Sequence, residues 1–177
     1  MREELIIAGF GGQGIMFTGT LLSQAAMIEG KFVTYFPSYG AEVRGGTANC
    51  SVTIADTIIG SPVITSPDSL IILNKPSLDK FGPRLKKGGL LVLNSTLIED
   101  EIKESNRQVV HIPATDIAEK IGQIKVANIV ALGKYLAIRK IVSQESIFQA
   151  LEALLTGKKK ELLELNRKAL AAGFEYQ

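Results

Sequence analysis

A glycine-rich turn close to the amino terminus constrains the fold of this chain more than any other segment. Residues 5–8 form a short apolar run, and the six residues that follow, GFGGQG at 9–14, satisfy the pattern GxGxxG. A helical pattern then occupies residues 15–29, and residues 32–36 have the pattern of a second strand. Because a strand, a glycine turn, a helix and a strand follow one another, the segment predicts a βαβ unit with a parallel pair of strands and a right-handed crossover.

The rest of the chain continues the alternation of strands and helices. We expect strands at residues 48–54, 69–73, 90–93 and 108–112, and a short hairpin strand at 58–59. We expect helices at residues 76–85, 115–121, 126–139, 143–155 and 158–172. Thr115 and Ser143 are the expected N-caps of two of these helices. The pattern predicts an α/β protein, a Rossmann-like three-layer α/β/α sandwich with a largely parallel sheet.

The composition agrees with buried parallel strands and limits the number of domains. Hydrophobic residues make up 46% of the chain but aromatic residues only 6%, and there is no tryptophan. The core must therefore consist mainly of isoleucine, leucine, valine and alanine, which suit parallel strands covered by helices. A length of 177 residues fits one domain, so we expect residues 1–177 to form a single unit.

Charge and residue counts exclude several classes of protein and site. The net charge is only +2 and no nucleic-acid-binding motif is present, so we expect no nucleic-acid partner. No apolar run reaches the roughly 18 residues that span a membrane, and acidic residues replace the positive start of a signal peptide, so we expect a cytoplasmic protein. The single cysteine, Cys50, excludes a disulfide or a four-cysteine metal site within this chain, which also has a single histidine, His111. We expect no catalytic residue and no metal ligand here, with Cys50 in the core and His111 at a strand end.

The glycine turn has two interpretations. The free amides at the start of a helix attract anions, and glycines let a ligand approach closely, as in dinucleotide-binding folds. Such folds place an acidic residue at the end of the second strand to bind ribose hydroxyls, but here Phe36 is followed by Pro37 and Ser38. The turn therefore predicts either a site for an anionic ligand or a tight turn without a ligand.

A second glycine-rich segment follows the second strand. It contains Ser38, Tyr39, Gly40, Glu42, Arg44, Gly45 and Gly46. Ligands of α/β folds bind where strands end, so we expect this segment to share one edge of the sheet with the glycine turn. Together with Gly11, Gly12, Gln13 and Gly14, it would form one composite surface that binds a ligand or a partner subunit.

The two segments together resemble the gamma subunits of 2-oxoacid:ferredoxin oxidoreductases. The motifs that carry the resemblance are GGQG at 11–14 and SYGxExRGG at 38–46, with PDSL at 67–70 before a buried strand. The resemblance covers nearly the whole chain. The second motif is more similar to the 2-oxoglutarate and branched-chain type than to the pyruvate type, which tends to carry consecutive arginines where this chain has Val43-Arg44.

The resemblance implies a subunit that is inactive alone. The family converts a 2-oxoacid, coenzyme A and oxidised ferredoxin into acyl-CoA, carbon dioxide and reduced ferredoxin. Thiamine diphosphate, Mg and iron–sulfur clusters would lie on the alpha and beta subunits, and on a delta subunit where one is present. This chain would bind none of these cofactors by itself.

Two roles for the composite surface remain open. The favoured role is packing against the catalytic subunits, and the other adds a contact to coenzyme A, whose phosphates would meet the turn amides or Arg44. The isolated chain would expose its docking face, so we expect that it can form a homo-oligomer.

The alternative from another class is a free-standing nucleotide- or flavin-binding protein that uses the GxGxxG turn. The missing acid after Phe36 argues against this alternative. A third alternative, an assembly module unrelated to oxoacids, is opposed by the presence of both motifs.

Overall fold

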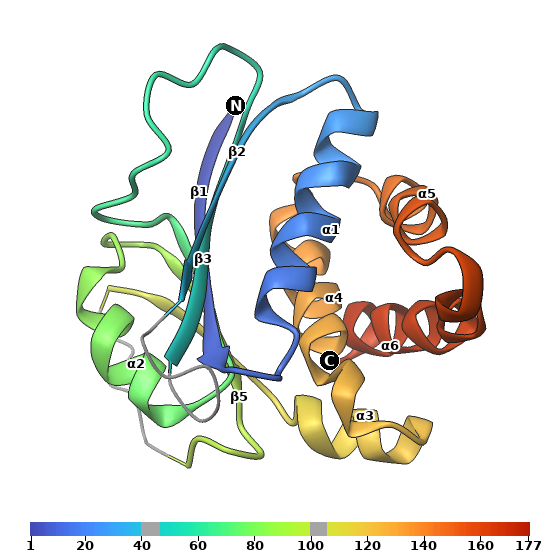
Figure 1. Ribbon diagram of the computed structural model, residues 1–177. Helices are drawn as coiled ribbons and strands as arrows, with labels where there is room; N and C mark the ends of the chain where they lie inside the picture. Colours follow the sequence, from blue (N-terminus) through green and yellow to red (C-terminus); the bar gives the residue numbers. More distant parts are fainter. Residues whose placement is uncertain (40–46, 100–105) are drawn as a thin grey trace.

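A computed structural model gives the structure of the chain and describes residues 1–39, 47–99 and 106–177. In these ranges six strands form one sheet in the order β2-β3-β1-β4-β5-β6 (Figure 1). Their bounds are β1 Arg2–Phe10, β2 Phe32–Tyr39, β3 Thr47–Ala55, β4 Ser69–Ile72, β5 Leu90–Asn94 and β6 Gln108–Ile112. The expected α/β class is confirmed.

Within the described sheet, only β3 runs against the other strands. The pairs β1–β4, β4–β5 and β5–β6 are parallel, whereas β3 is antiparallel to both β1 and β2. The largely parallel sheet is therefore confirmed, but the prediction that β1 and β2 pair with each other is wrong. The two strands point the same way with β3 between them, because an antiparallel neighbour can follow β2 after a short connection and needs no helical crossover.

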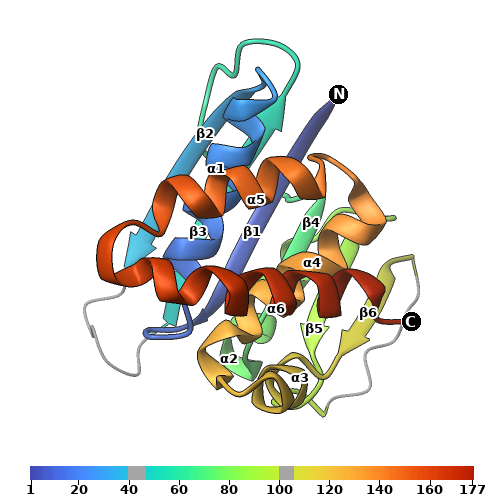
Figure 2. The same ribbon diagram turned by 90° about the vertical axis from the view of Figure 1, so that its right-hand side faces the viewer.

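Helices cover the two faces of the sheet unequally. Their bounds are α1 Ile15–Ile28, α2 Lys75–Phe81, η1 Gly82–Arg84, α3 Ala114–Ile121, η2 Ile124–Val126, α4 Ala127–Arg139, α5 Gln144–Leu154, η3 Gly157–Leu162 and α6 Leu163–Glu175, where η marks 3₁₀-helices. Helices α1 and α4 lie on one face with α5 and α6 outside them, and α2 lies on the other face (Figures 1 and 2). Among the described helices, none has the length and apolar character needed to cross a membrane.

Apolar side chains fill both sides of the central strand. Leu5 and Ile7 of β1 belong to the core beneath α1 and α4, whereas Ile6 and Ala8 belong to the core beneath α2. Alternate residues of a strand point to opposite faces, so a strand buried on both sides has a continuous apolar run. This burial accounts for the unbroken run at residues 5–8.

Three local predictions are wrong. Residues 56–68 contain no strand, and Ile58 is 82% exposed, because the chain passes directly to β4, which pairs with β1. Thr115 does not cap α3: Pro113 occupies the N-cap, and the Thr115 hydroxyl accepts a hydrogen bond from Asn94 Nδ2 at 2.8 Å. The last helix begins with the 3₁₀-helix η3 and becomes an α-helix only from Leu163.

Helices α4 and α6 cross with their backbones in close contact. A Cβ atom added at Gly173 of α6 would lie 1.9 Å from the carbonyl oxygen of Val130 in α4, and one added at Gly133 would lie 2.2 Å from the carbonyl oxygen of Leu170. Both distances are far below a van der Waals contact. Glycine at these two positions therefore permits the crossing that holds α6 against α4.

The carboxyl end of α1 is tied to the amino end of α5 through Glu29. Its Oε1 accepts hydrogen bonds from the backbone N–H of Ser143 at 2.6 Å and from the hydroxyl of Ser146 at 2.8 Å. Its Oε2 lies 2.8 Å from Lys31 Nζ. Burial alone raises the pKa of Glu29, but the hydrogen bonds to its carboxylate outweigh burial and lower this pKa to about 2. Ser143 is the N-cap of α5, as predicted.

Gly173→Ala should destabilise the protein, because the added methyl group would push α6 away from Val130. Overpacking of this kind costs about 1–3 kcal/mol, which corresponds to a fall in Tm of roughly 3–10 °C for a chain of this size. Differential scanning calorimetry measures the change. Gly60→Ala is the matched control, since a Cβ at Gly60 meets only open space. A Tm for Gly173→Ala at or above that of the wild type would contradict the close crossing.

Glu29→Gln should lower the free energy of unfolding by about 2 kcal/mol at neutral pH. Because the folded state lowers the pKa of Glu29 from 4.5 to about 2, the carboxylate contributes stability above pH 4.5 that is lost as the pH falls towards 2. The difference in the free energy of unfolding between wild type and variant, measured by urea unfolding, should therefore become smaller from about pH 5 to about pH 3. Glu161→Gln, at an exposed position, should show no such narrowing. If the difference in free energy of unfolding between wild type and Glu29→Gln stays constant with pH, the Glu29 carboxylate does not contribute this stability.

Candidate functional site

The glycine turn lies at the edge of the sheet where the parallel strands end. Strand β1 ends at Phe10 and α1 begins at Ile15. From the central β1 the chain first builds β2 and β3 on one side and later β4, β5 and β6 on the other. The turn therefore occupies the switch point of the sheet, which is where α/β folds bind ligands.

The side chain of Gln13 closes the turn from within. Its Oε1 accepts a hydrogen bond from the backbone N–H of Phe10 at 2.6 Å, and the Gln13 backbone N–H donates to the Phe10 carbonyl oxygen at 3.1 Å. The acceptor end of this side chain is thus used inside the turn. Gln13 shapes the backbone around the site, and Gly11 and Gly12 form the exposed part of the turn.

Gly14 connects the turn to α4. It is the N-cap of α1 in a left-handed conformation with φ of 73°, which favours glycine. A Cβ atom at this position would lie 2.4 Å from Nδ2 of Asn128 in α4. That nitrogen donates to the carbonyl oxygen of Gly14 at 3.1 Å and to the hydroxyl oxygen of Thr18 at 2.9 Å. Asn128 therefore locks the turn and the first turn of α1 against α4.

The amino end of α1 has no side-chain cap among the described residues. Its first turn also contains no acidic residue. The first N–H groups of a helix have no partner within the helix and carry the positive end of its dipole. An anion could accept hydrogen bonds from these N–H groups, so the choice between an anion site and a tight turn without a ligand stays open.

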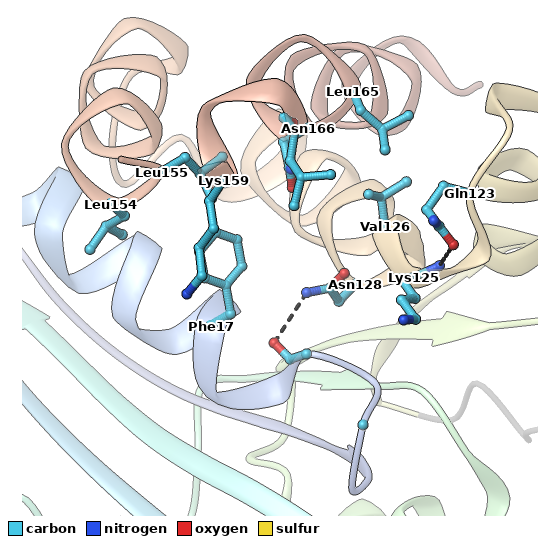
Figure 3. A pocket seen from close by; sticks show the side chains of 13 residues that line it. Phe17, Gln123, Lys125, Val126, Asn128, Leu154, Leu155, Lys159, Leu165 and Asn166 are labelled. Carbon is cyan, nitrogen blue, oxygen red and sulfur yellow. Dashed lines mark hydrogen bonds between the residues drawn. The ribbon is translucent and has the colours of Figure 1, made fainter. Parts of the chain in front are cut away.

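A pocket of about 480 Å³ lies beside the turn, between α1, the start of α4 and the segment from α5 to α6; we call it the turn pocket (Figure 3). It is lined by Gly12, Gly14, Phe17, Gln123, Lys125, Val126, Asn128, Leu154, Leu155, Lys159, Leu162, Leu165 and Asn166. Apolar side chains predominate, and the two charged side chains are both lysines. The pocket can therefore hold an apolar body with an anionic group near the turn.

The second glycine-rich segment begins and ends at the same edge as the turn. Thr47 of β3 pairs with Phe10 of β1, and Tyr39 of β2 pairs with Ala48 of β3. Ser38 is exposed on β2. The remaining predicted residues, Gly40, Glu42, Arg44, Gly45 and Gly46, lie outside the described residues. The shared edge is confirmed for the ends of the segment, and the composite surface stays a prediction.

The described residues offer no metal centre. They contain no group of three or more histidine, cysteine, aspartate or glutamate side chains placed to hold a metal ion. Cys50 is fully buried and its thiol donates to the carbonyl oxygen of Ile15 at 3.5 Å. Burial raises the pKa of Cys50 to about 12, so the thiolate that would ligate iron or zinc is disfavoured. His111 is exposed on β6.

Sequence reasoning missed the side chains that complete the turn pocket. Lys125, Asn128, Lys159 and Asn166 come from segments more than a hundred residues after the turn. Asn128 offered one signal, since it is a polar residue within the apolar helical run NIVAL. A buried asparagine in such a run needs a specific partner, and here the partner is the turn.

Comparison with known proteins places this architecture in a family. The model of the family described as pyruvate ferredoxin/flavodoxin oxidoreductase matches residues 4–176. Ketoisovalerate oxidoreductase subunit VorA of Methanothermobacter marburgensis is 39% identical over 171 residues, which cover 96% of this chain but 35% of VorA. This chain thus spans about a third of the length of that relative.

Two of the similar proteins match this chain over nearly their whole length. The 2-oxoglutarate synthase subunit KorC of Methanocaldococcus jannaschii is 37% identical over 178 residues, covering 99% of this chain and 94% of KorC. The crystal structure of a keto/oxoacid ferredoxin oxidoreductase gamma subunit from Geobacter sulfurreducens PCA superimposes with a TM-score of 0.84 at 34% identity, covering 98% of this chain and 96% of that one. The chain belongs to the pyruvate ferredoxin/flavodoxin oxidoreductase family.

Proposed function

We propose that this chain is the gamma-type subunit of a 2-oxoacid:ferredoxin oxidoreductase and that it acts only within the complex. The observation that carries the proposal is the family match over residues 4–176. KorC, a subunit of 2-oxoglutarate synthase by name, supports it because the two chains match over nearly their full lengths. The complex would oxidatively decarboxylate a 2-oxoacid to acyl-CoA and reduce ferredoxin.

The proposed division of labour leaves the redox chemistry to partner subunits. The buried, weakly acidic thiol of Cys50 does not fit an iron–sulfur cluster. Thiamine diphosphate with Mg and the clusters would therefore lie on the alpha and beta subunits, and on a delta subunit where one is present. The gamma chain would contribute a binding surface at the edge formed by Gly11–Gly14 and the segment at 38–46.

This surface would pack against the catalytic subunits, and it would also contact coenzyme A. The open amino end of α1 offers backbone donors to a phosphate group, and Arg44 would add a positive charge from the second segment. Among 2-oxoacids we favour 2-oxoglutarate, with branched-chain 2-oxoacids and pyruvate next, because the chain carries Val43 before Arg44. The relatives named for 2-oxoglutarate and for ketoisovalerate are nearly equal in identity, so the substrate needs a direct test.

A tagged copy of the chain, purified without oxygen from its own host, should bring down its partner subunits. The eluate should contain iron and thiamine diphosphate and should reduce a viologen dye when given coenzyme A and a 2-oxoacid. Rates with 2-oxoglutarate, 3-methyl-2-oxobutanoate and pyruvate would identify the substrate. A chain that elutes alone and inactive but binds NAD or a flavin tightly would replace the proposal with a free-standing nucleotide-binding protein, which the open end of α1 also suits.

Arg44→Ala in the purified complex should raise KM for coenzyme A by about tenfold and change KM for the 2-oxoacid little, because a lost phosphate contact costs roughly 1–2 kcal/mol. Arg107→Ala is the matched control: Arg107 directly precedes β6, at the opposite edge of the sheet. Steady-state kinetics of both variants measure the difference. An unchanged KM for coenzyme A in Arg44→Ala would remove Arg44 from the contact.

A further inference from the structure

We propose that a pocket at the end of the sheet opposite the glycine turn binds an acidic α-amino acid, such as aspartate or glutamate. The pocket, which we call the basal pocket, has a volume of about 240 Å³ and is lined mainly by charged side chains. These are Arg2, Glu3, Asp68, Lys86, Lys87 and Arg139. The inference does not rest on the proposed oxidoreductase activity.

The basal pocket lies where the parallel strands begin. Strands β1, β4 and β5 start at Arg2, Ser69 and Leu90, and α4 ends at Arg139. Figure 1 shows the amino end of β1 and the glycine turn at opposite ends of that strand. The nine residues of β1 separate the two places by roughly 25 Å, because a strand advances about 3.3 Å per residue. The basal pocket is therefore a separate site.

A buried carboxyl group in the wall of the pocket has a free acceptor. Glu3 is 7% exposed, and its Oε1 accepts hydrogen bonds from the hydroxyls of Ser69 at 2.5 Å and Tyr135 at 3.2 Å. Its Oε2 accepts no hydrogen bond from any described residue, and it is not one of the unpaired polar atoms that are sealed from solvent. Because Glu3 lines the pocket, Oε2 is the oxygen that a ligand can reach. A carboxylate oxygen in so buried a side chain needs a donor.

The environment of Glu3 favours a donor that is positively charged. Burial raises the pKa of the Glu3 carboxyl group, and the hydrogen bond from Ser69, the charge of Arg139 and the hydrogen bond from Tyr135 offset this only in part. An ammonium group against Oε2 would stabilise the carboxylate and lower this pKa. A hydroxyl donor would bring no compensating charge.

Two cationic side chains of the pocket have free donors. Arg139 donates from Nε to the hydroxyl oxygen of Ser69 at 2.9 Å and from Nη2 to the carbonyl oxygen of Asp68 at 3.1 Å. Its Nη1 makes no hydrogen bond within the described ranges. Lys87 is exposed and forms no ion pair with the part of the chain that the structure describes. Guanidinium and ammonium groups form charge-assisted hydrogen bonds with carboxylates, so each of these two side chains can hold one carboxylate.

The other charges around the pocket are already paired. Arg2 Nη2 lies 2.7 Å from Glu4 Oε1, and Lys86 Nζ lies 2.7 Å from Asp68 Oδ1. Counted together with Glu4, the site has four basic and three acidic side chains, so it carries one excess positive charge. A ligand with one net negative charge would neutralise it.

An acidic α-amino acid matches the three free groups and the charge. Its ammonium group would pair with Glu3 Oε2, and its two carboxylates would pair with Arg139 and Lys87. The corresponding 2-oxoacid has a keto oxygen in place of the ammonium group, so it would set an acceptor against Oε2. A protein side chain carries only one kind of charge. A volume of about 240 Å³ lies below the roughly 300–1,000 Å³ of pockets for drug-sized ligands, which favours a small free molecule.

Isothermal titration calorimetry of the full chain should show binding of L-aspartate or L-glutamate with a Kd of about 1 mM or lower. The amino acid that binds should do so about tenfold more tightly than its 2-oxoacid, oxaloacetate or 2-oxoglutarate, and than L-alanine, which lacks the second carboxylate. Equal affinity for the amino acid and its 2-oxoacid would reduce the pocket to an anion site and overturn the proposal. Absence of binding by both acidic amino acids would also overturn it.

Two variants locate the binding in the basal pocket. Lys87→Ala should weaken binding of the amino acid about tenfold, whereas Lys120→Ala, which removes the same charge at an exposed position of α3, should leave it unchanged. Glu3→Gln should weaken binding of the amino acid about tenfold but not that of the 2-oxoacid, a change in selectivity that lost packing alone would not produce.

Thermal unfolding checks that each variant is folded. Lys87 is exposed, so Lys87→Ala tests the site even where Glu3→Gln does not fold. Unchanged affinity for the amino acid in folded Lys87→Ala would place the ligand elsewhere and refute the assignment.

Discussion

The hydrogen bonds of a single buried amide, that of Asn128, hold together the parts of the chain on which the site depends. Its Nδ2 joins the carbonyl oxygen of Gly14 to α4 and also binds the hydroxyl of Thr18 one turn along α1. Helix α4 is in turn held against α6 by the glycine crossing at Gly133 and Gly173. Both contacts involve helices whose residues line the turn pocket, namely α1, α4 and α6.

The two ends of α1 have opposite electrostatic roles. The amino end carries no acid and no side-chain cap within the described residues, so no side chain there compensates the positive end of the helix dipole. The carboxyl end is followed by Glu29, a negative charge where the helix dipole disfavours one. Glu29 is compensated because it also lies at the amino end of α5, where Ser143 and Ser146 donate to it. Side chains of α5 thus compensate the carboxyl end of α1, whereas no described side chain caps its amino end.

Sequence reasoning succeeded where a local pattern had one structural solution. The glycine turn between β1 and α1, the buried strand β4 and the capping serine before α5 were all recognised from a few adjacent residues. It failed where pairing between distant strands decided the outcome. The position of β3 between β1 and β2 cannot be read from residues 47–55, since their alternation of apolar and polar side chains fits an antiparallel strand beside either neighbour.

The sequence by itself determined the α/β class, the place of the glycine turn at a strand end and the family resemblance carried by two short motifs. These features depend on residues next to one another, and the backbone conformation that glycine permits is a local property. Only the tertiary structure decided what faces the turn. Asn128 of α4 bonds to Gly14, and Lys125 of η2 and Lys159 of η3 line the pocket beside the turn. Such contacts between segments a hundred residues apart leave no periodic signal in the sequence.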